Sequence, residues 1–420
     1  MRNILGLLLS CLVCVPSIAQ RGGTTFYRTY QEPGKTTSLN SIQQTRDGGY
    51  IAIGSSLSSV YDLIVLRLDS AGRVYWQHNY VVPGQVSQAI SIHETSSGYI
   101  ALAALGPAGI NQTLMVMRMD PTGVLLWQNT YPTSAGVIPY FIEPTTDGGY
   151  LVSAYQFSSA YSLWGLKLDS TGAIVWQKGF GTYAGLGSIH ATADGGAIVA
   201  GGVQSGDTYA GRVLKLNAVG NREWDRYYTF PFDAFFTSVR PTPEGGFIVS
   251  GYYITVGTSS KALLIKLGLD GKVTATFAYG SSSCPSETAF GAQNLVGGGY
   301  LFSLGFCNGA SDSVARIDAS GAILWQRAPA NVFEAAISPT LDGGYVAAGQ
   351  AGTMLVVKAN ASGALPECLQ NGTPDLVRVD PPPVVVTAVA GPIENTFTQP
   401  NPIAVTASPA HLTTQFTCNP

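Results

Sequence analysis

A unit of about 50 residues recurs seven times in this 420-residue chain, and the repeat limits the folds that the chain can adopt. Each copy has a Gly-containing turn followed by an apolar run, as in "DGGYIAIG" (47–54). The residues that follow the turns are Tyr50, Tyr99, Tyr150, Ala197, Phe247, Tyr300 and Tyr345, spaced by 49, 51, 47, 50, 53 and 45 residues. A period near 50 residues is typical of a four-stranded β-propeller blade.

Two further marks recur in register with the turns. The first is a basic residue followed five positions later by Gly, in the pairs Arg67/Gly72, Arg118/Gly123, Lys167/Gly172, Lys215/Gly220, Lys266/Gly271, Arg316/Gly321 and Lys358/Gly363. The second is a Trp four residues after that Gly, at Trp76, Trp127, Trp176, Trp224 and Trp325. Ala275 and Glu367 take the Trp position in the other two units. Three marks in register make chance a poor explanation of the repeat.

Each unit reads as four strands, A to D, which in the first unit are 41–45, 50–54, 63–68 and 73–80. "DGG" joins A to B, and "DSAG" joins C to D. Asp-Gly and Gly-Gly pairs favour the positive φ angles of tight hairpins, and Asp can close an Asx-turn. Charged residues make up only 11% of the chain and there are 50 Gly. Low charge with many turn formers also indicates an all-β protein.

The two ends of the repeat predict how the ring closes. Seven A-B-C sets span 41–358. The segment after the last set, "ALPECLQ", contains Pro366 and is a poor candidate for strand D. The N-terminal segment "TFYRTY" (25–30) has no A-B-C set before it, and its Phe26 aligns with Trp76. We therefore expect this segment to complete the last blade. The predicted fold is an all-β, seven-bladed β-propeller closed by the N-terminal strand, which removes exposed sheet edges.

The sequence predicts three segments. Residues 1–19 have a basic residue, a short apolar run and a small-x-small ending at Ala19, as in a signal peptide, with a lipoprotein signal as an alternative. Residues 20–367 form the propeller, and 368–420 form an extension rich in Pro, Val and Thr. We expect a secreted or outer-surface protein with no transmembrane segment after cleavage near Ala19. A net charge of −3 disfavours nucleic acid as a partner.

Four cysteines lie outside the predicted signal peptide, and an even number in an exported chain favours disulfides. Cys284 and Cys307 fall in loops expected on the same face of one blade. Cys368 and Cys418 bracket the extension, so a bond between them would tie it to the ring. Four cysteines allow three connectivities, and the sequence alone does not choose among them.

The turns and loops predict one uniform face and one variable face. A-to-B and C-to-D turns are short and repetitive, whereas B-to-C and D-to-A loops differ in every blade, and variable loops on a rigid scaffold usually carry recognition. Aromatic residues gather in these loops around blades three to five. The predicted ligand-binding residues are Tyr140, Phe141, Tyr155, Tyr161, Trp164, Phe230, Phe232, Phe236, Tyr252 and Tyr253. The alternative for each is packing between blades.

Strand A places one polar series at equivalent positions near the expected central channel: Gln43, His93, Glu143, His190, Arg240, Gln293 and Ser338. His93, Glu143, His190 and Arg240 could hold an ion or do acid–base work, and the alternative is a solvated channel lining. The "DGG" turns offer one carboxylate each, too few for calcium, and three copies lack the Asp. We interpret them as hairpin turns. The strand C basic residue with the "KLD" Asp recurs as a framework ion pair or packing of its stem would. The sequence predicts no metal or cofactor.

The phrase "DGGYI-x-x-G" with "KLD-x-x-G-x-x-x-W" resembles the blade repeats of secreted bacterial propellers, including delta-60 repeat proteins, over residues 25–367. This resemblance implies export to the cell surface. "LDSTGAIVWQ" (168–177) is similar to the tryptophan motif of quinoprotein dehydrogenases, which implies eight blades and a calcium site with pyrroloquinoline quinone. Seven blades are counted here and that site cannot be assembled, so the motif indicates Trp packing between blades.

These features favour a non-catalytic binding or interaction module for a polysaccharide or a surface protein, met by the variable aromatic face. One alternative is a quinoprotein-like oxidoreductase or a glycan-active propeller enzyme. Another is a structural subunit of an outer-surface assembly, with the C-terminal extension as its docking element.

Overall fold

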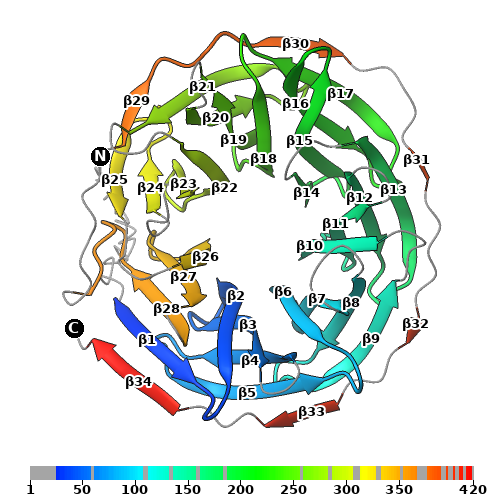
Figure 1. Cartoon of the computed structure of the whole chain (residues 1–420), viewed down its shortest axis with the longest axis vertical. Helices are drawn as coiled ribbons and strands as arrows, with labels where there is room; N and C mark the ends of the chain where they lie inside the picture. Colours follow the sequence, from blue (N-terminus) through cyan, green and yellow to red (C-terminus); the bar gives the residue numbers. More distant parts are fainter. Residues whose placement is uncertain are drawn as a thin grey trace, which may run out of the picture.

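A computed structural model describes the chain from Thr25 to Cys418, apart from a series of gaps. The described residues are 25–57, 61–106, 112–131, 136–157, 161–182, 187–255, 259–281, 286–305, 313–327, 333–350, 353–366, 376–388, 394–395, 401–402, 406–409 and 413–418. They form strands β1 to β34 in seven antiparallel sheets set around a central axis (Figure 1). Over these ranges the chain has no helix that could cross a membrane. The predicted fold, a seven-bladed β-propeller, is confirmed.

The first four blades follow the chain in order, each with its innermost strand first. Blade 1 holds β2 (Thr36–Gln44), β3 (Tyr50–Leu57), β4 (Tyr61–Leu68) and β5 (Val74–Val81). Blade 2 holds β6 (Ser87–Thr95), β7 (Gly98–Leu105), β8 (Thr113–Met119) and β9 (Leu125–Tyr131). Blade 3 holds β10 (Gly136–Pro144), β11 (Tyr150–Phe157), β12 (Tyr161–Leu168) and β13 (Ile174–Thr182). Blade 4 holds β14 (Ser188–Ala191), β15 (Ala197–Ser205), β16 (Thr208–Leu216) and β17 (Arg222–Thr229).

The last three blades include the closing one. Blade 5 holds β18 (Ala234–Pro241), β19 (Phe247–Ile254), β20 (Ser260–Leu267) and β21 (Val273–Gly280). Blade 6 holds β22 (Thr288–Asn294), β23 (Tyr300–Gly305), β24 (Ser313–Ile317) and β25 (Ile323–Arg327). Blade 7 combines β26 (Phe333–Pro339), β27 (Tyr345–Gln350) and β28 (Met354–Ala359) with the N-terminal β1 (Phe26–Gln31).

The N-terminal strand closes the ring as predicted. β1 pairs antiparallel with β28, in a register that runs from Phe26 opposite Lys358 to Tyr30 opposite Met354. Phe26 and Tyr30 are both buried in the core between blades 7 and 1. The second strand of blade 2, β7, is buried along its whole length because a neighbouring blade covers each face of the sheet.

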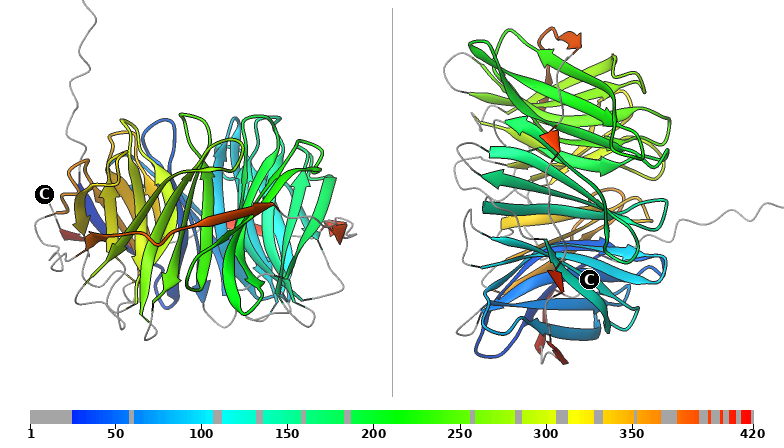
Figure 2. Two further views of the ribbon diagram at one scale, coloured as in Figure 1. Left: turned by 90° about the horizontal axis from the view of Figure 1, so that it is seen from above. Right: turned by 90° about the vertical axis from the view of Figure 1, so that its right-hand side faces the viewer.

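The C-terminal extension forms a belt around the ring, which the sequence analysis did not predict. Its strands are β29 (Val377–Val379), β30 (Val385–Ala388), β31 (Glu394–Asn395), β32 (Asn401–Pro402), β33 (Thr406–Pro409) and β34 (Thr413–Cys418). In this order they add a fifth, outermost strand to blades 5, 4, 3, 2, 1 and 7 (Figure 1). The side view shows the belt following the outer wall of the ring (Figure 2). We use "belt" for β29–β34.

The first belt strands show why this segment pairs with the ring. Val379 and Val386 are half-buried against the apolar core of blades 4 and 5, whereas Val377 and Val385 are exposed. This alternation is that of a strand with one covered face, and β-branched residues suit it. The belt also satisfies backbone groups at the outer sheet edges, which would otherwise be templates for pairing with other chains.

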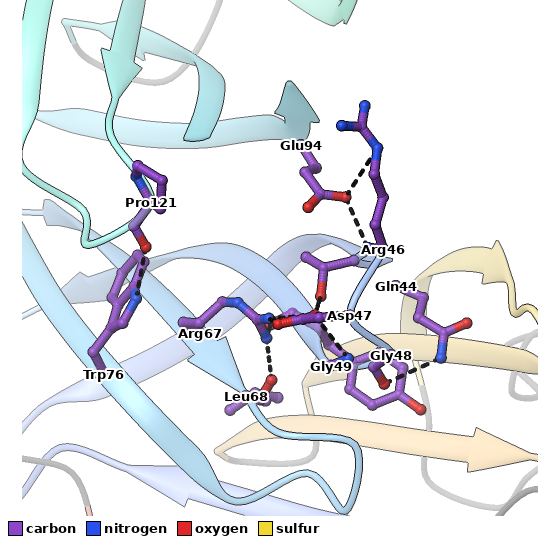
Figure 3. A network of polar contacts seen from close by, with 12 residues as sticks. Gln44, Arg46, Asp47, Gly48, Gly49, Arg67, Leu68, Trp76, Glu94 and Pro121 are labelled. Atoms are coloured by element: carbon purple, nitrogen blue, oxygen red, sulfur yellow. Dashed lines mark hydrogen bonds and ion pairs between the residues drawn. The ribbon is translucent and has the colours of Figure 1, made fainter. Parts of the chain in front are cut away.

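The recurring Trp residues join each blade to the next. The Nε1 of Trp76 donates to the carbonyl of Pro121, in the C-to-D turn of the following blade, at 3.2 Å (Figure 3). Trp127, Trp176, Trp224 and Trp325 make the same bond to the next turn. A Cβ on Gly123, whose φ is +87°, would lie only 3.1 Å from the Trp76 ring, so this turn needs Gly for its conformation and for close packing. The predicted role of the motif in blade packing is confirmed.

Phe residues take this place where the Trp is missing. Phe26 of β1 lies against Gly72, and Phe277 lies against Gly321, two positions after the Ala275 that replaces Trp. Tyr side chains further along the outer strands add a second link, because Tyr30, Tyr80, Tyr131, Tyr228 and Tyr279 each donate a hydroxyl hydrogen bond to the turn Gly carbonyl of the next blade. The aromatic repeat is therefore an interblade lock.

The basic residue of strand C pairs with the Asp of the "DGG" turn, which corrects the expected pairing with the "KLD" Asp. The pairs are Arg67–Asp47, Lys167–Asp147, Lys215–Asp194 and Lys358–Asp342 (Figure 3 shows the first). Asp69, of the "KLD" position, instead accepts from the backbone of its own turn, at Ala71 and Arg73. Where Ser97 replaces the Asp, Arg118 donates to its hydroxyl at 2.7 Å. The acidic turns thus anchor the hairpins.

These ion pairs predict a loss of stability in acid. Burial alone would raise the pKa of Asp147 and Asp194, but hydrogen bonds from Lys167 and Lys215, with turn donors, outweigh it and lower each pKa to about 2. A pKa below the ordinary 3.8 stabilises the fold fully above about pH 4, and this contribution is lost as the pH falls towards 2. We expect the double substitution Asp147→Asn and Asp194→Asn to cost about 0.5–1 kcal/mol per pair at pH 7.

Urea unfolding at pH 7, 4 and 2 measures this effect. The free energies of unfolding of wild type and variant should converge by pH 2. Asp207→Asn, which changes an exposed carboxylate that forms no ion pair in the described part of the chain, is the control and should follow wild type at every pH. If the free energies of unfolding of the double variant and wild type differed by the same amount at all three pH values, these ion pairs would not be the source of the acid sensitivity.

Candidate functional site

A central cavity of about 540 Å³ lies on the axis of the propeller. The innermost strands of all seven blades line it, through the part of each strand that leads into the A-to-B turn. All seven members of the predicted polar series line this cavity: Gln43, His93, Glu143, His190, Arg240, Gln293 and Ser338. The ring therefore brings together residues that lie up to 295 positions apart, from Gln43 to Ser338.

A β-bulge in the innermost strand sets which side chains face the cavity. In blade 1 the register shifts between Leu39 and Ser41, so that Leu39 and Ile42, three positions apart, are both buried in the core. Ser41 and Gln43 line the cavity. Similar shifts occur in blades 2, 3, 5, 6 and 7. A bulge changes the phase of the alternation, and here it keeps apolar residues in the core beside a polar lining.

Serine hydroxyls fix neighbouring inner strands to each other beside the cavity. The Oγ of Ser41 accepts from the backbone N of Ile92 at 3.3 Å, and the Oγ of Ser188 accepts from Val239 at 2.9 Å. Ser91 accepts from the next blade in the same way. The cavity wall is therefore rigid, which a preformed site requires.

Glu143 and His190 form a hydrogen-bonded pair on one side of the cavity. The distance from His190 Nδ1 to Glu143 Oε2 is 3.0 Å, and Nδ1 donates because a carboxylate only accepts. The backbone N of Ala191 donates to the other oxygen. Burial would raise the pKa of Glu143, but the nearby charges and these donors outweigh it and lower the pKa. Burial, together with Arg240, lowers the pKa of His190.

Phe141 lies at the centre of the charged group. Its ring centroid is 4.9 Å from that of His93 and 5.0 Å from that of His190, both edge-on. The Cζ of Arg240 lies 5.7 Å from the same ring. Burial lowers the pKa of His93 to about 4, so His93 is neutral at pH 7. Among the described residues no group of three or more His, Cys, Asp or Glu could hold a metal ion.

Five of the predicted ligand-binding aromatics are core residues, which corrects the expectation of an exposed surface at those positions. They are Tyr155, Trp164, Phe230, Phe236 and Tyr253, all less than 9% exposed. The reason is blade packing: Trp164, for example, lies between blades 2 and 3 with Tyr131 and Val137. Rings at these positions fill the wedge between adjacent sheets.

The other predicted aromatics divide between two places. Tyr140 and Phe141 line the central cavity. Phe232 and Tyr252 are partly exposed at the variable end of blade 5. The side chain of Tyr161 lies outside the described residues. Sequence reasoning missed Phe235, which stacks on Tyr252, and Tyr209, which packs against Phe235. Alternation could have found Phe235, since Phe236 points into the core.

We call Tyr209, Phe232, Phe235 and Tyr252 the aromatic platform. The rings of Phe235 and Tyr252 are stacked with centroids 5.1 Å apart, and the Tyr209 ring lies 5.0 Å from Phe235. Phe232 stacks on the buried Tyr253 at 6.3 Å. All four platform residues are partly exposed. They belong to the ends of blades 4 and 5 that carry the variable loops.

The uniform face also carries apolar side chains, a feature that its repetitive turns did not predict. Large apolar residues are exposed in or next to the short turns of every blade: Tyr75, Val124, Leu126, Val175, Val219, Leu269, Val296, Leu324 and Leu341. Their exposed fractions run from 54% to 77%. Both the uniform face and the variable face of the ring therefore present side chains that can contact a partner.

Several expectations concern residues that the structure leaves undescribed. Residues 1–19, the expected signal peptide, lie outside the described range, as do Cys284, Cys307 and Cys368. The backbone of Cys418 belongs to β34, where it pairs with Tyr27. The disulfide predictions therefore remain predictions.

No protein-family model matches the chain, and a search of curated proteins finds no significant match. Among solved structures the chain is similar to the crystal structure of Sqt1 from Chaetomium thermophilum. The two are 13% identical, with a TM-score of 0.43 over 78% of this chain and 82% of the other. At that level the likeness carries no functional argument, and the fold rests on the sheet topology described above.

Proposed function

We propose that this protein is an exported, non-catalytic propeller module that binds a polysaccharide through the aromatic platform. The observation that carries the proposal is the stack of partly exposed rings formed by Tyr209, Phe235 and Tyr252. Aromatic rings give large contact areas at little entropic cost and suit the C–H faces of sugar rings. The predicted signal peptide at residues 1–19 supports export, where polysaccharides are met.

The platform is built on the scaffold rather than on a free loop. Phe235 and Tyr252 are opposite one another in the register of β18 and β19. The backbone N of Tyr209 donates to Asp233 Oδ1 at 2.8 Å, which ties the start of β16 to the segment before β18. Rigid positioning of this kind favours binding, because few rotamers are lost when a ligand arrives.

A surface protein is the second candidate partner, and the exposed apolar residues of the uniform face favour it. Leu269 and Leu341 are 69% and 63% exposed, in the short turns of blades 5 and 7. Such residues recur at the short turns of every blade, and an apolar surface to which several blades contribute is one that a protein partner can cover. The alternative of an outer-surface assembly docked through the extension is less favoured, since the described belt strands pair with the ring itself.

The enzymatic alternatives have less support. The quinoprotein resemblance implies eight blades, and this ring has seven. The residues that recur in every blade serve the framework, as hairpin ion pairs and interblade locks. Groups singular to one blade do line the cavity, but Glu143 and His190 are hydrogen-bonded to each other there.

A glycan array with the mature protein tests the proposal. We expect Phe235→Ala with Tyr252→Ala to weaken binding to any recognised glycan at least about tenfold, because ring contacts at the centre of a site dominate its affinity. Leu269→Ser is the matched control on the other face and should leave glycan binding unchanged. Unchanged glycan binding by the platform variant would refute the site assignment. Loss of a protein partner in Leu269→Ser alone would favour the second candidate.

A further inference from the structure

Arg240 brings a positive charge into the central cavity without a direct hydrogen-bonded partner among the described residues. Its guanidinium forms no hydrogen bond and no ion pair within 4.0 Å with any described residue, and its Nε is buried without an acceptor. Glu143 partly offsets this charge through space, but N–H groups that have lost water and have no acceptor remain costly to bury. The described part of the cavity therefore leaves the Arg240 guanidinium without a hydrogen-bond acceptor.

The nearby carboxylate of Glu143 interacts with Arg240 through space, but no hydrogen bond joins the two side chains. Both oxygens of Glu143 already accept hydrogen bonds from blade 4, from His190 Nδ1 and from the backbone N of Ala191. The Nε2 of His93 is also buried without a partner. The charged side of the cavity thus has unused hydrogen-bonding groups around Arg240 and His93, and an anion would complement the guanidinium.

Packing holds the guanidinium in place. The Cζ of Arg240 lies 5.7 Å from the centroid of Phe141, in cation–π contact, and the edge of the His93 ring meets the same Phe. A planar guanidinium with free N–H groups matches a carboxylate, which it can bind with two parallel hydrogen bonds. The geometry favours a carboxylate over a hydroxyl at this position.

The other side of the cavity is uncharged. Blades 1, 6 and 7 contribute Gln43, Gln293 and Ser338, across the axis from blades 3 and 4 (Figure 1). The amide of Gln43 makes no hydrogen bond in the described part of the chain, and Gln293 uses its Nε2 on the carbonyl of Ile337, at 2.6 Å. Amides and hydroxyls both donate and accept, as the hydroxyls of a ligand do.

We propose that the central cavity is a binding site for a small hydroxylated carboxylate, such as a hexuronate, with its carboxylate on Arg240 and its hydroxyls towards Gln43 and Gln293. The cavity volume of 540 Å³ is within the range of about 300–1,000 Å³ that is usual for small-molecule sites. The site shares no residue with the aromatic platform, so it does not depend on the proposed function.

Calorimetric titration of the full chain with D-glucuronate at pH 7 tests this site. We expect one ligand per chain, with D-glucose and inorganic phosphate at least about tenfold weaker, since each lacks one half of the recognised chemistry. Arg240→Gln should weaken glucuronate binding at least about tenfold, which is the effect of one lost charge-assisted hydrogen bond. Phe235→Ala, at the platform, is the control and should bind glucuronate as wild type does.

Three results would overturn the inference: no glucuronate binding by the wild type, equal binding by a folded Arg240→Gln variant, or phosphate binding as tight as that of glucuronate. Thermal unfolding establishes whether Arg240→Gln is folded. If it is not, Arg240→Lys and Gln43→Ala decide, because the first keeps the charge without the planar fork and the second removes an amide that has no other bond. Both should weaken glucuronate binding, and unchanged affinity in both would refute the site. Loss of glycan-array binding has no bearing on this result.

Discussion

Deletion of Phe26–Gln31 is expected to abolish cooperative folding of the propeller. β1 supplies the outer strand of the four that make blade 7 and pairs with both β28 and β34. Burial of Phe26 and Tyr30 alone is worth about 3–6 kcal/mol, before the strand hydrogen bonds are counted. Because a typical domain is stable by only about 5–15 kcal/mol, this loss removes most of the margin. Circular dichroism during urea unfolding should show a broad transition or none.

Point variants in the same strand sharpen this first prediction. Tyr30→Ala removes a fully buried ring and its hydroxyl bond to Gly72, and should lower the free energy of unfolding by about 3–5 kcal/mol. Tyr27→Ala is the matched control, since its ring is only partly buried and the loss should be smaller. If both variants lost the same free energy of unfolding, the buried side of β1 would not be the dominant contact in ring closure.

Truncation after Leu376, which removes the belt, is expected to leave a ring that folds but self-associates. The outer strands of blades 1 to 5 and β1 of blade 7 would lose their paired edges. Open edges are templates for pairing between chains, so size-exclusion chromatography should show concentration-dependent oligomers. We expect a loss of about 2–5 kcal/mol in the free energy of unfolding, because each net hydrogen bond is small and part is offset by the ordering of the segment.

Stepwise truncation separates the belt strands from one another. Removal of β34 alone should lower the free energy of unfolding by more than one sixth of the loss caused by removal of all six belt strands. The reason is that β34 pairs with β1, the strand that closes the ring. Shortening further, past β33 and β32, should then lower the unfolding midpoint in smaller steps. A truncated chain that stays monomeric with wild-type stability would show that the belt has no protective role.

The ring could be predicted from sequence because its marks repeat. Seven Gly turns spaced by about 50 residues give the number of blades, and the alignment of Phe26 with Trp76 gives the closure. Both rest on local chemistry, namely turn conformations and an aromatic that meets a Gly of the next blade. The partner of the strand C basic residue was mistaken, because units such as the first and third carry an Asp at both turns, and only the fold shows which one the basic residue reaches.

The belt could not be predicted, and the reason is the length of its strands. β31 and β32 have two residues each, too short for any alternation to be seen. They are strands only because the edges of β13 and β9 are already in place to pair with them. Tertiary context, rather than local propensity, decides such segments.

Within the candidate site, the cavity lining could be predicted from the sequence, whereas the exposure of the aromatic residues could not. The cavity lining followed from equivalent positions in strand A, because a ring with one innermost strand per blade leaves those positions facing the axis. The exposure of single aromatics did not follow. Phe235 and Phe236 are neighbours in sequence, yet one is partly exposed and the other is fully buried, and the bulge just after them sets the phase of the rest of the strand.

The double pairing of β1 also governs the order of events during folding. Phe26 meets Lys358, 332 residues further along the chain, and Tyr27 meets Cys418, 391 residues further along. The first strand to be synthesised is therefore among the last to acquire its neighbours. Contacts this distant in sequence make folding slow, because most of the chain must be placed before they form. Until then the ring is an open arc, and the waiting strand is the part of the molecule that most needs protection from other chains.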